Sequence, residues 1–168
     1  SFQTYDDLGK YYYVMCTNPW DIETTGSNKG YVRVNFRSNA YHAWSPVHYN
    51  EFNLSNNTTS TITLENKGNI HKYYYPKIEI VNLDSNQEIV LKPLSDSGRE
   101  FRIKNLHLNE VVGFDNDKEI IVSSLEYDNI YRLSDFNKNW LRLVYGKNRI
   151  QITGKCILKV KSQFPIIR

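Results

Sequence analysis

Histidine is the residue type in this sequence best suited to hold a metal ion or to move a proton near neutral pH. The chain has four histidines, His42, His48, His71 and His107, and none has a cysteine or carboxylate at metal-ligand spacing. His42 and His48 lie close enough in sequence to meet in a loop, but ordinary polar surface positions are the better interpretation. The sequence therefore predicts no metal site, and no motif indicates a cofactor.

Three acidic residues, Asp115, Asp117 and Glu119, alternate along one short stretch. Carboxylates at this spacing occur in calcium loops, but an EF-hand loop also needs a glycine and a distal glutamate, and both are missing. Asn and Asp favour tight turns, and apolar residues flank the run on both sides. We therefore predict a hairpin turn between strands at residues 111–112 and 120–122.

Motifs that carry catalysis are absent from the sequence. It contains no nucleophile elbow, zinc-protease helix, P-loop or dinucleotide-binding glycine motif. No nucleophile with a neighbouring base can be picked out. A glycosidase needs two carboxylates about 5–10 Å apart in a cleft, which a sequence alone does not exclude. We predict that the protein is not an enzyme.

Cysteine content and charge exclude other classes of function. Cys16 and Cys156 either pair, if the two ends of the chain meet, or remain thiols, and we expect buried thiols. The formal net charge is +3, and the basic residues are scattered singly, which argues against nucleic acid as a partner. No run of 18 apolar residues is present, so no membrane insertion is expected.

Aromatic residues are the feature best suited to binding, and thirteen of them are tyrosines. The candidates for contact with a ligand or partner are Trp44, Tyr73, Tyr74 and Trp140. Exposed rings on a β-sandwich can stack against sugars, whereas packing in the core or an interface is the simpler interpretation. If Leu141 faces the core of a strand, alternation places Trp140 on the outer face, where we expect residues 134–139 to cover it.

Strict alternation of apolar and polar residues recurs along the chain and predicts many short, half-buried strands. The alternating segments are residues 32–36, 62–64, 78–80, 141–143, 150–152 and 158–160. Turn-forming residues separate them at 66–69, 84–86, 96–98, 115–117 and 146–148. One turn of helix is expected near residues 133–137, capped by Ser134. This pattern predicts an all-β fold, a two-sheet antiparallel β-sandwich.

The N-terminal residues do not show the regular pattern of strands and turns that the remainder shows. Residues 11–16 suit one strand, and residues 24–30 are predicted to form a long loop rich in Thr, Ser, Asn and Gly. We therefore expect residues 1–29 to be a connector or the end of a preceding domain, and residues 30–168 to form the sandwich. The chain begins with Ser1 rather than Met, which suggests a fragment of a longer protein.

Several stretches resemble a known family. Residues 30–46 (GYVRVNFRSNAYHAWSP) resemble the strand that enters the C-terminal domain of distal tail proteins of long-tailed phages. Residues 139–154 (NWLRLVYGKNRIQITG) resemble a late hairpin of that domain, in which Gly146 and Asn148 would turn the chain. Residues 75–80 (YPKIEI) and 105–124 are similar to a strand and a hairpin between them.

The resemblance implies a galectin-like or jelly-roll-like sandwich, similar also to carbohydrate-binding modules. In that family the N-terminal domain builds a hexameric ring, so the full-length protein is expected to be a ring-forming homo-oligomer. The C-terminal sandwich projects from the ring and docks other tail parts. Phages, prophages and tail-derived bacteriocins carry such parts.

The functional expectation follows from this resemblance. The chain should be a structural and interaction module of a tail tip or baseplate, with other phage tail or baseplate proteins as partners. It should reside in the virion after assembly in the bacterial cytoplasm. The alternative is a carbohydrate-binding module that recognises host cell-wall glycans. A row of Trp and Tyr rings on one sheet face would distinguish the alternative.

Overall fold

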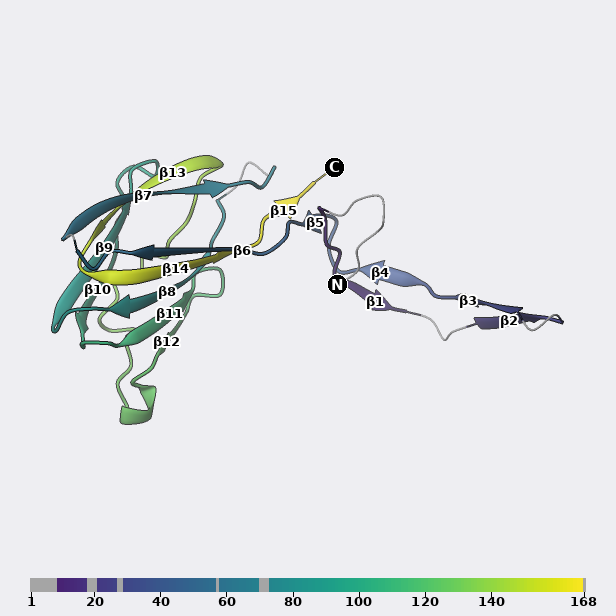
Figure 1. Ribbon diagram of the computed structural model, residues 1–168, viewed down its shortest axis with the longest axis horizontal. Coiled ribbons are helices and arrows are strands. Elements are labelled where there is room, and N and C mark those ends of the chain that lie inside the picture. The colour runs from purple at the N-terminus through teal and green to yellow at the C-terminus, as the bar shows by residue number, and fades with distance from the viewer. Residues whose placement is uncertain (1–8, 18–20, 27–28, 57, 70–72, 168) are drawn as a thin grey trace. The chain divides into compact units, whose positions relative to one another are not determined.

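The computed structural model of the protein describes residues 9–17, 21–26, 29–56, 58–69 and 73–167 (Figure 1). Within these residues the secondary structure is almost entirely antiparallel β-strand, with a single 3-10 helix, η1 (Glu126–Asp128). The prediction of an all-β fold is confirmed. The chain divides into two compact units, unit 1 with Ser1–Pro46 and Pro165–Arg168, and unit 2 with Val47–Phe164.

Unit 2 is a sandwich of two antiparallel sheets, as the sequence predicted (Figure 1). The four-stranded sheet has the order β10-β9-β13-β7, and the five-stranded sheet has the order β12-β11-β8-β14-β6. The strands are β6 (His48–Asn53), β7 (Thr59–Asn66), β8 (Lys77–Asn82), β9 (Gln87–Pro93), β10 (Phe101–Leu106), β11 (Val111–Asp115), β12 (Ile120–Ser123), β13 (Gly146–Thr153) and β14 (Cys156–Ser162).

The core of unit 2 lies between the two sheets and is built from alternate residues of their strands. The four-stranded sheet contributes Ile62, Leu64, Ile89, Leu91, Phe101, Ile103, Ile150 and Ile152, and the five-stranded sheet contributes Ile78, Ile80, Val112, Phe114, Leu158 and Val160. Burying each such side chain stabilises the fold by about 1.5–3 kcal/mol before the cost in conformational entropy. The period-2 pattern in the sequence is therefore the pattern of the core.

The turn at residues 116–119 joins β11 to β12, with Asp115 opposite Ile120 in the register. Asp115 accepts a hydrogen bond from the Lys118 amide at 3.2 Å, which closes the turn. The predicted hairpin is confirmed, and it accounts for the acidic run.

The loop that follows η1 lies along the outer edge of β10. The Lys104 amide donates to the Asp135 carbonyl at 3.1 Å, and the Asn137 amide donates to the Arg102 carbonyl at 3.0 Å. Phe136 forms an isolated bridge with Ile103, and its ring is buried. The expected helical turn at residues 133–137, capped by Ser134, is therefore wrong: pairing with β10 and burial of Phe136 outweigh the local helical preference.

The predicted strand at residues 141–143 is also wrong. Leu143 pairs only with Tyr74, through two backbone hydrogen bonds of 2.7 and 2.9 Å. The Leu141 amide instead donates to the side chain of Asn116 at 2.8 Å. Leu141 and Leu143 are buried on either side of the partly exposed Arg142, as the alternation indicated, but Trp140 is buried as well.

The predicted turn at residues 146–148 lies inside β13, which begins at Gly146. The chain instead turns just before this strand begins. The Asn148 side chain accepts from the Val144 amide at 2.9 Å and donates to the Val144 and Gly146 carbonyls at 2.8 and 2.9 Å. Gly146 has φ of +83°, which glycine adopts without strain. Asn148 thus shapes the turn through its side chain while its backbone belongs to the strand.

The described residues of unit 1 form three two-stranded pairings. They join β1 (Val14–Cys16) to β4 (Phe36–Ser38), β2 (Asp21–Thr25) to β3 (Lys29–Arg33), and β5 (Ala43–Trp44) to β15 (Pro165–Ile166). The long loop expected at residues 24–30 is wrong, because Thr24 pairs with Gly30 in the β2–β3 hairpin. The buried face expected for residues 32–36 is also wrong: Val32 and Phe36 are exposed.

The compact units divide the chain after residue 46, whereas the sequence placed a boundary after residue 29. Strands β3, β4 and β5 group with the N-terminal residues because their pairing partners lie in unit 1. The assignment of residues 1–29 to a connector and of residues 30–168 to the sandwich domain stays a prediction.

Candidate functional site

The outer face of the five-stranded sheet is the first surface of unit 2 suited to a partner. Its residues follow from the register. One row across the strands is Ile120, Asp115, Lys77, Lys161 and Tyr49, and the next is Val122, Gly113, Glu79, Lys159 and Glu51. Each row places an apolar residue of β12 beside charged residues on the central strands. We call these ten residues the outer face.

Ion pairs link the central strands of the outer face. Lys77 contacts Asp115 at 2.6 Å, and Lys159 contacts Glu79 at 2.8 Å. Burial acts to raise the pKa of Asp115, but hydrogen bonds from Lys77 and the Lys118 amide outweigh it, so this pKa lies below its usual value. The hydrogen bond to Glu79 raises the pKa of Lys159. These charged side chains pair with one another. The apolar margin of the outer face is therefore formed by β12.

A shallow hollow of about 350 Å³ lies on this face. Gly113 has no side chain to fill it, and the exposed side chains of Ile120 and Val122 border it. Tyr49, 72% exposed, lies at the other margin, with the Lys161 ammonium 5.5 Å from its ring centre. The arrangement offers apolar contact area framed by charges, which suits docking of a protein surface.

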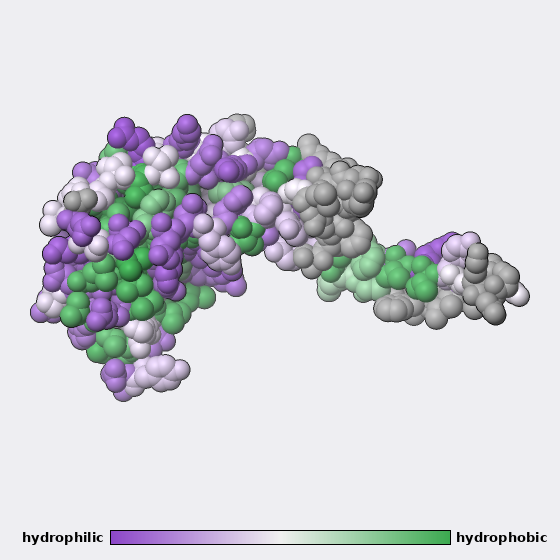
Figure 2. All heavy atoms as spheres, in the orientation of Figure 1, coloured by the Kyte–Doolittle hydropathy of each residue, from purple (hydrophilic) through white to green (hydrophobic). Residues whose placement is uncertain are grey.

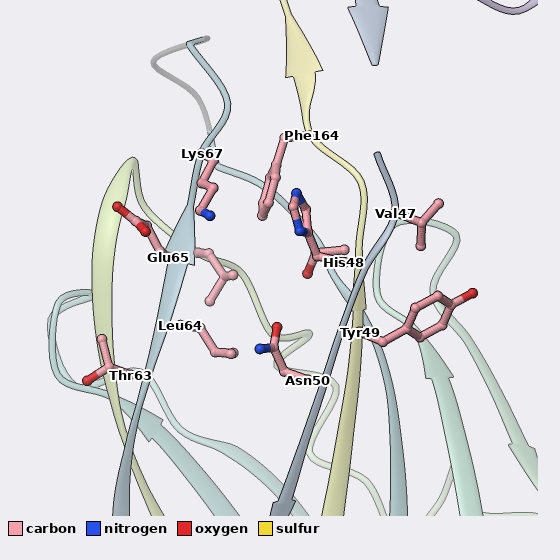
Figure 3. A pocket seen from close by; sticks show the side chains of 11 residues that line it. Val47, His48, Tyr49, Asn50, Thr63, Leu64, Glu65, Lys67 and Phe164 are labelled. Carbon is pink, nitrogen blue, oxygen red and sulfur yellow. The ribbon is translucent and has the colours of Figure 1, made fainter. Parts of the chain in front are cut away.

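A second hollow of about 360 Å³ opens between β6 and β7, the edge strands of the two sheets (Figure 3). Leu64 and Phe164, both buried, form its apolar part. Asn50, Glu65 and Lys67 line it with polar groups. The aromatic pair there, His48 and Phe164, has ring centres 5.8 Å apart.

The four residues predicted as contacts are divided between the two units. Trp44 lies in unit 1, with its ring centre 4.7 Å from that of His42. Tyr73 lies beneath the Arg142 guanidinium, 3.8 Å from its ring centre. The Tyr74 hydroxyl accepts from the Gln163 amide at 2.8 Å. Neither hollow is lined by Trp44, Tyr73, Tyr74 or Trp140.

Trp140 is 8% exposed and packs on Phe136 of the preceding loop, with ring centres 4.8 Å apart. Phe136 helps to cover the ring, as expected, but the expected place on the outer face of a strand is wrong, because Trp140 belongs to the core cluster. The sequence did not single out Tyr49, Ile120 or Val122. The alternation in β14, with Lys159 and Lys161 outward, was a signal for an exposed face, but only the register in the structure places Tyr49 beside Lys161.

Metal and thiol chemistry draw no support from the part of the chain that the structure describes. In that part no group of three His, Cys, Asp or Glu residues could hold a metal ion. Cys16 is exposed, which differs from the buried thiol expected, and Cys156 is buried. Burial raises the pKa of the Cys156 thiol to about 11, so it is unreactive near neutral pH.

Among the described residues, no helix has the length and apolar character needed to cross a bilayer.

The fold defines a class: a two-sheet antiparallel β-sandwich with a packed core. Sequence comparison then specifies it, because the model of the family described as phage tail C-terminal domain matches residues 42–162. The chain belongs to this family of phage tail domains.

Two relatives extend the comparison. The chain is 24% identical over 156 residues to the SPbeta prophage-derived uncharacterized protein YomH of Bacillus subtilis strain 168, covering 91% of this chain and 58% of that protein. The fold matches the crystal structure of the SPP1 Dit (gp 19.1) protein with a TM-score of 0.60 and 16% identity, covering 95% of this chain and 63% of that one. The chain thus spans about three fifths of each relative. The resemblance to a distal tail protein is confirmed, whereas the narrower galectin-like description stays a prediction.

Proposed function

We propose that this chain is a structural and interaction module of a phage or prophage tail tip, which docks other tail or host-adhesion components and has no enzymatic activity. The observation that carries the proposal is an agreement of boundaries. The family match covers residues 42–162, and the compact sandwich is Val47–Phe164. The part of the chain that is similar to phage tail domains is therefore the part that has its own core.

The named relatives support a place at the tail tip. The SPP1 Dit protein is described as a paradigm of the hub adsorption apparatus in phages that infect Gram-positive bacteria, and YomH derives from a prophage. By this likeness, the partners are other tail or baseplate proteins, and the site of action is the virion after assembly in the bacterial cytoplasm. The full-length protein forms a homo-oligomeric ring, while the fragment of residues 1–168 is monomeric or weakly associated.

Immunogold microscopy of purified particles tests the proposal. The full-length protein carries an epitope tag after its last residue, and particles are induced and purified. We expect gold at the distal end of the tail. Label along the tail tube, on the capsid, or absent from particles that contain the other tail proteins would overturn the proposal. Sedimentation of the fragment checks the second point, since a stable hexamer at micromolar concentration would contradict it.

The alternative, a carbohydrate-binding module for host-wall glycans, draws less support. Sugar platforms on sheets use rows of exposed rings. Among the described strand residues that point outward from the five-stranded sheet, Tyr49 is the one aromatic side chain. Binding of the fragment to purified cell-wall glycan, abolished by Tyr49→Ala, would promote this alternative.

A further inference from the structure

A loop of unit 2, residues 124–135, is held at its base and exposed at its tip. It contains η1, which lies beyond β12 at the lower end of the unit in Figure 1, and it forms a small lobe there in Figure 2. We call residues 124–135 the η1 loop.

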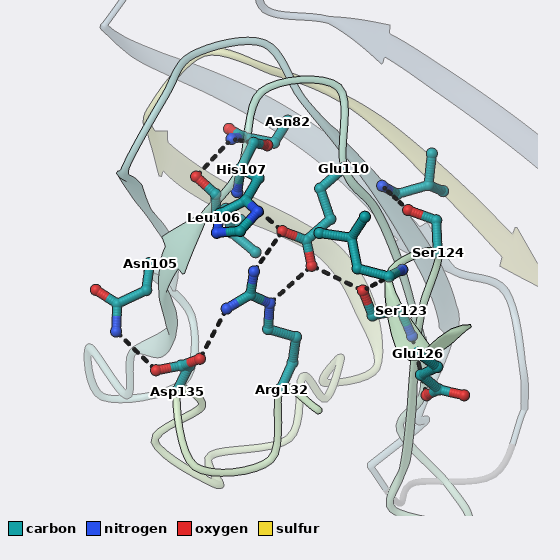
Figure 4. A network of polar contacts seen from close by, with 12 residues as sticks. Asn82, Asn105, Leu106, His107, Glu110, Ser123, Ser124, Glu126, Arg132 and Asp135 are labelled. Atoms are coloured by element: carbon teal, nitrogen blue, oxygen red, sulfur yellow. Dashed lines mark hydrogen bonds and ion pairs between the residues drawn. The ribbon is translucent and has the colours of Figure 1, made fainter. Parts of the chain in front are cut away.

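The base of the η1 loop is fixed by a buried ion pair (Figure 4). The Arg132 guanidinium donates to both carboxylate oxygens of Glu110 at 2.7 Å and to Asp135 at 2.9 Å. Glu110 also accepts from the Ser123 hydroxyl at 2.7 Å and from the His107 amide at 2.8 Å. The side chains of Glu110 and Arg132 are 0% and 4% exposed. A charge cluster this well satisfied holds both ends of the loop to the sandwich.

The loop is also ordered internally. The amides of Asp128 and Ile130 donate to the Leu125 carbonyl at 3.0 and 3.2 Å, and the Asn129 amide donates to the Glu126 carbonyl at 3.0 Å. Asn129 adopts φ of +61°, a left-handed conformation that asparagine tolerates. A surface shaped in advance loses little conformational entropy when a partner binds.

The tip of the loop exposes large side chains and carries negative charge. Tyr127 is 98% exposed, and Tyr131 and Leu133 are 64% and 53% exposed. Asp128 is exposed beside Tyr127. The one basic residue of the loop, Arg132, is already held by Glu110 and Asp135. Tyrosines that stand out in this way are typical anchors of protein interfaces.

The same molecule shows what a carboxylate beside a tyrosine binds. Asp96 accepts from Arg142 Nε at 2.7 Å and from its Nη2 at 3.0 Å, while the Tyr73 ring covers the guanidinium at 3.8 Å. The η1 loop exposes a carboxylate, Asp128, and two tyrosines, Tyr127 and Tyr131, while its own arginine is held by Glu110 and Asp135. Charge complementarity therefore favours an arginine from another chain.

We infer that the η1 loop is a docking surface for an arginine-bearing segment of another tail protein, with Tyr127, Asp128 and Tyr131 as its contacts. This inference rests on the proposed function. It goes beyond it by naming the surface and the chemistry of the partner.

Photo-cross-linking in purified particles tests the inference. p-Benzoylphenylalanine replaces Tyr127 in the full-length protein, and cross-linked peptides are identified by mass spectrometry. We expect a product that joins position 127 to an arginine-containing peptide of a different tail protein. Added Asp128→Arg should lower its yield about tenfold or more, and Asp117→Arg, an exposed acidic residue in the β11–β12 turn, should leave the yield unchanged.

The two proposals fail differently. If the protein is present in particles but position 127 yields no product, or only products with a second copy of this chain, the docking surface is wrong and the tail-tip assignment stands. A yield that Asp128→Arg does not change would also overturn the arginine-bearing partner. If the protein is absent from particles, both proposals fall. Thermal unfolding of the Asp128→Arg fragment, expected to match that of the parent, excludes misfolding as the cause.

Discussion

Arg132 and Glu110 form a buried, bidentate ion pair, in which Nε and Nη2 of Arg132 each lie 2.7 Å from a different carboxylate oxygen of Glu110. Removing one member leaves a buried charge without its partner, which costs about 3–5 kcal/mol. We therefore expect Arg132→Ala to lower the free energy of unfolding by about that amount in urea denaturation. Arg149→Ala, at an exposed position of β13, is the matched control and should change it by less than about 0.5 kcal/mol. Equal losses in both variants would contradict the assignment.

Acid should destabilise unit 2 through two carboxyl groups. Hydrogen bonds from Arg142 hold the pKa of Asp96 below its usual 3.8. Burial raises the pKa of Glu110, but hydrogen bonds from Arg132, the His107 amide and Ser123 outweigh it and hold this pKa below 4.5. A depressed pKa contributes stability that is fully present above the unfolded-state value and is lost as pH falls through the folded-state value.

We expect the free energy of unfolding to be nearly constant from neutral pH down to about pH 5 with respect to these groups, and to fall below about pH 4. Urea denaturation at a series of pH values measures it. Asp96→Asn, less stable at neutral pH, should show a shallower decline in acid. A parent protein that becomes more stable between pH 5 and pH 3 would refute this account.

Trp140 should contribute to stability rather than to binding. It is 8% exposed and packs on Phe136, so Trp140→Ala leaves a cavity and should cost about 2–4 kcal/mol. The shift in the urea midpoint measures this cost, and Tyr49→Ala, at an exposed ring, serves as the control. An unchanged midpoint for Trp140→Ala, together with loss of glycan binding, would reverse the interpretation.

Two glycines should respond in opposite ways to alanine. Gly154 has φ of +107°, and a Cβ there would lie 2.8 Å from the Glu88 carbonyl oxygen. Gly154→Ala should therefore destabilise the protein by more than about 1 kcal/mol, because both the backbone conformation and the space forbid the methyl group. At Gly113 a Cβ would meet nothing closer than 3.9 Å, so Gly113→Ala should be neutral or slightly stabilising. Thermal melts compare the two, and equal effects would count against the predicted contrast.

Much of the sandwich was predictable from the sequence, because its core follows strand alternation. Ile78 and Ile80 of β8, and Ile150 and Ile152 of β13, face the core as their spacing indicated. Register across strands was not predictable, since it depends on which strands become neighbours. The outer face, with Tyr49 beside Lys161, therefore emerged only with the fold.

Some segments were predicted wrongly because side chains rather than strand ladders hold them. The Leu141 amide donates a hydrogen bond to the side chain of Asn116, 25 residues away in sequence, and no local sequence pattern predicts such a contact. Arg132 and Glu110 show the same limit, since they are 22 residues apart and belong to a loop and a strand margin. Candidate rings such as Tyr73 and Trp140 stood out by type alone, and type does not distinguish an exposed ring from one that supports the fold.

The segment that follows η1 occupies the hydrogen-bonding groups of β10 at Arg102 and Lys104, so this side of the four-stranded sheet cannot readily accept a strand from a neighbouring molecule. Uncontrolled growth of sheets by edge-to-edge addition is a general route to aggregation. The opposite edge strand, β7, has no proline, and its exposed positions include Thr61, Thr63 and Glu65. Of the two edges of this sheet, β7 is therefore the one whose outer side a neighbouring strand would meet first.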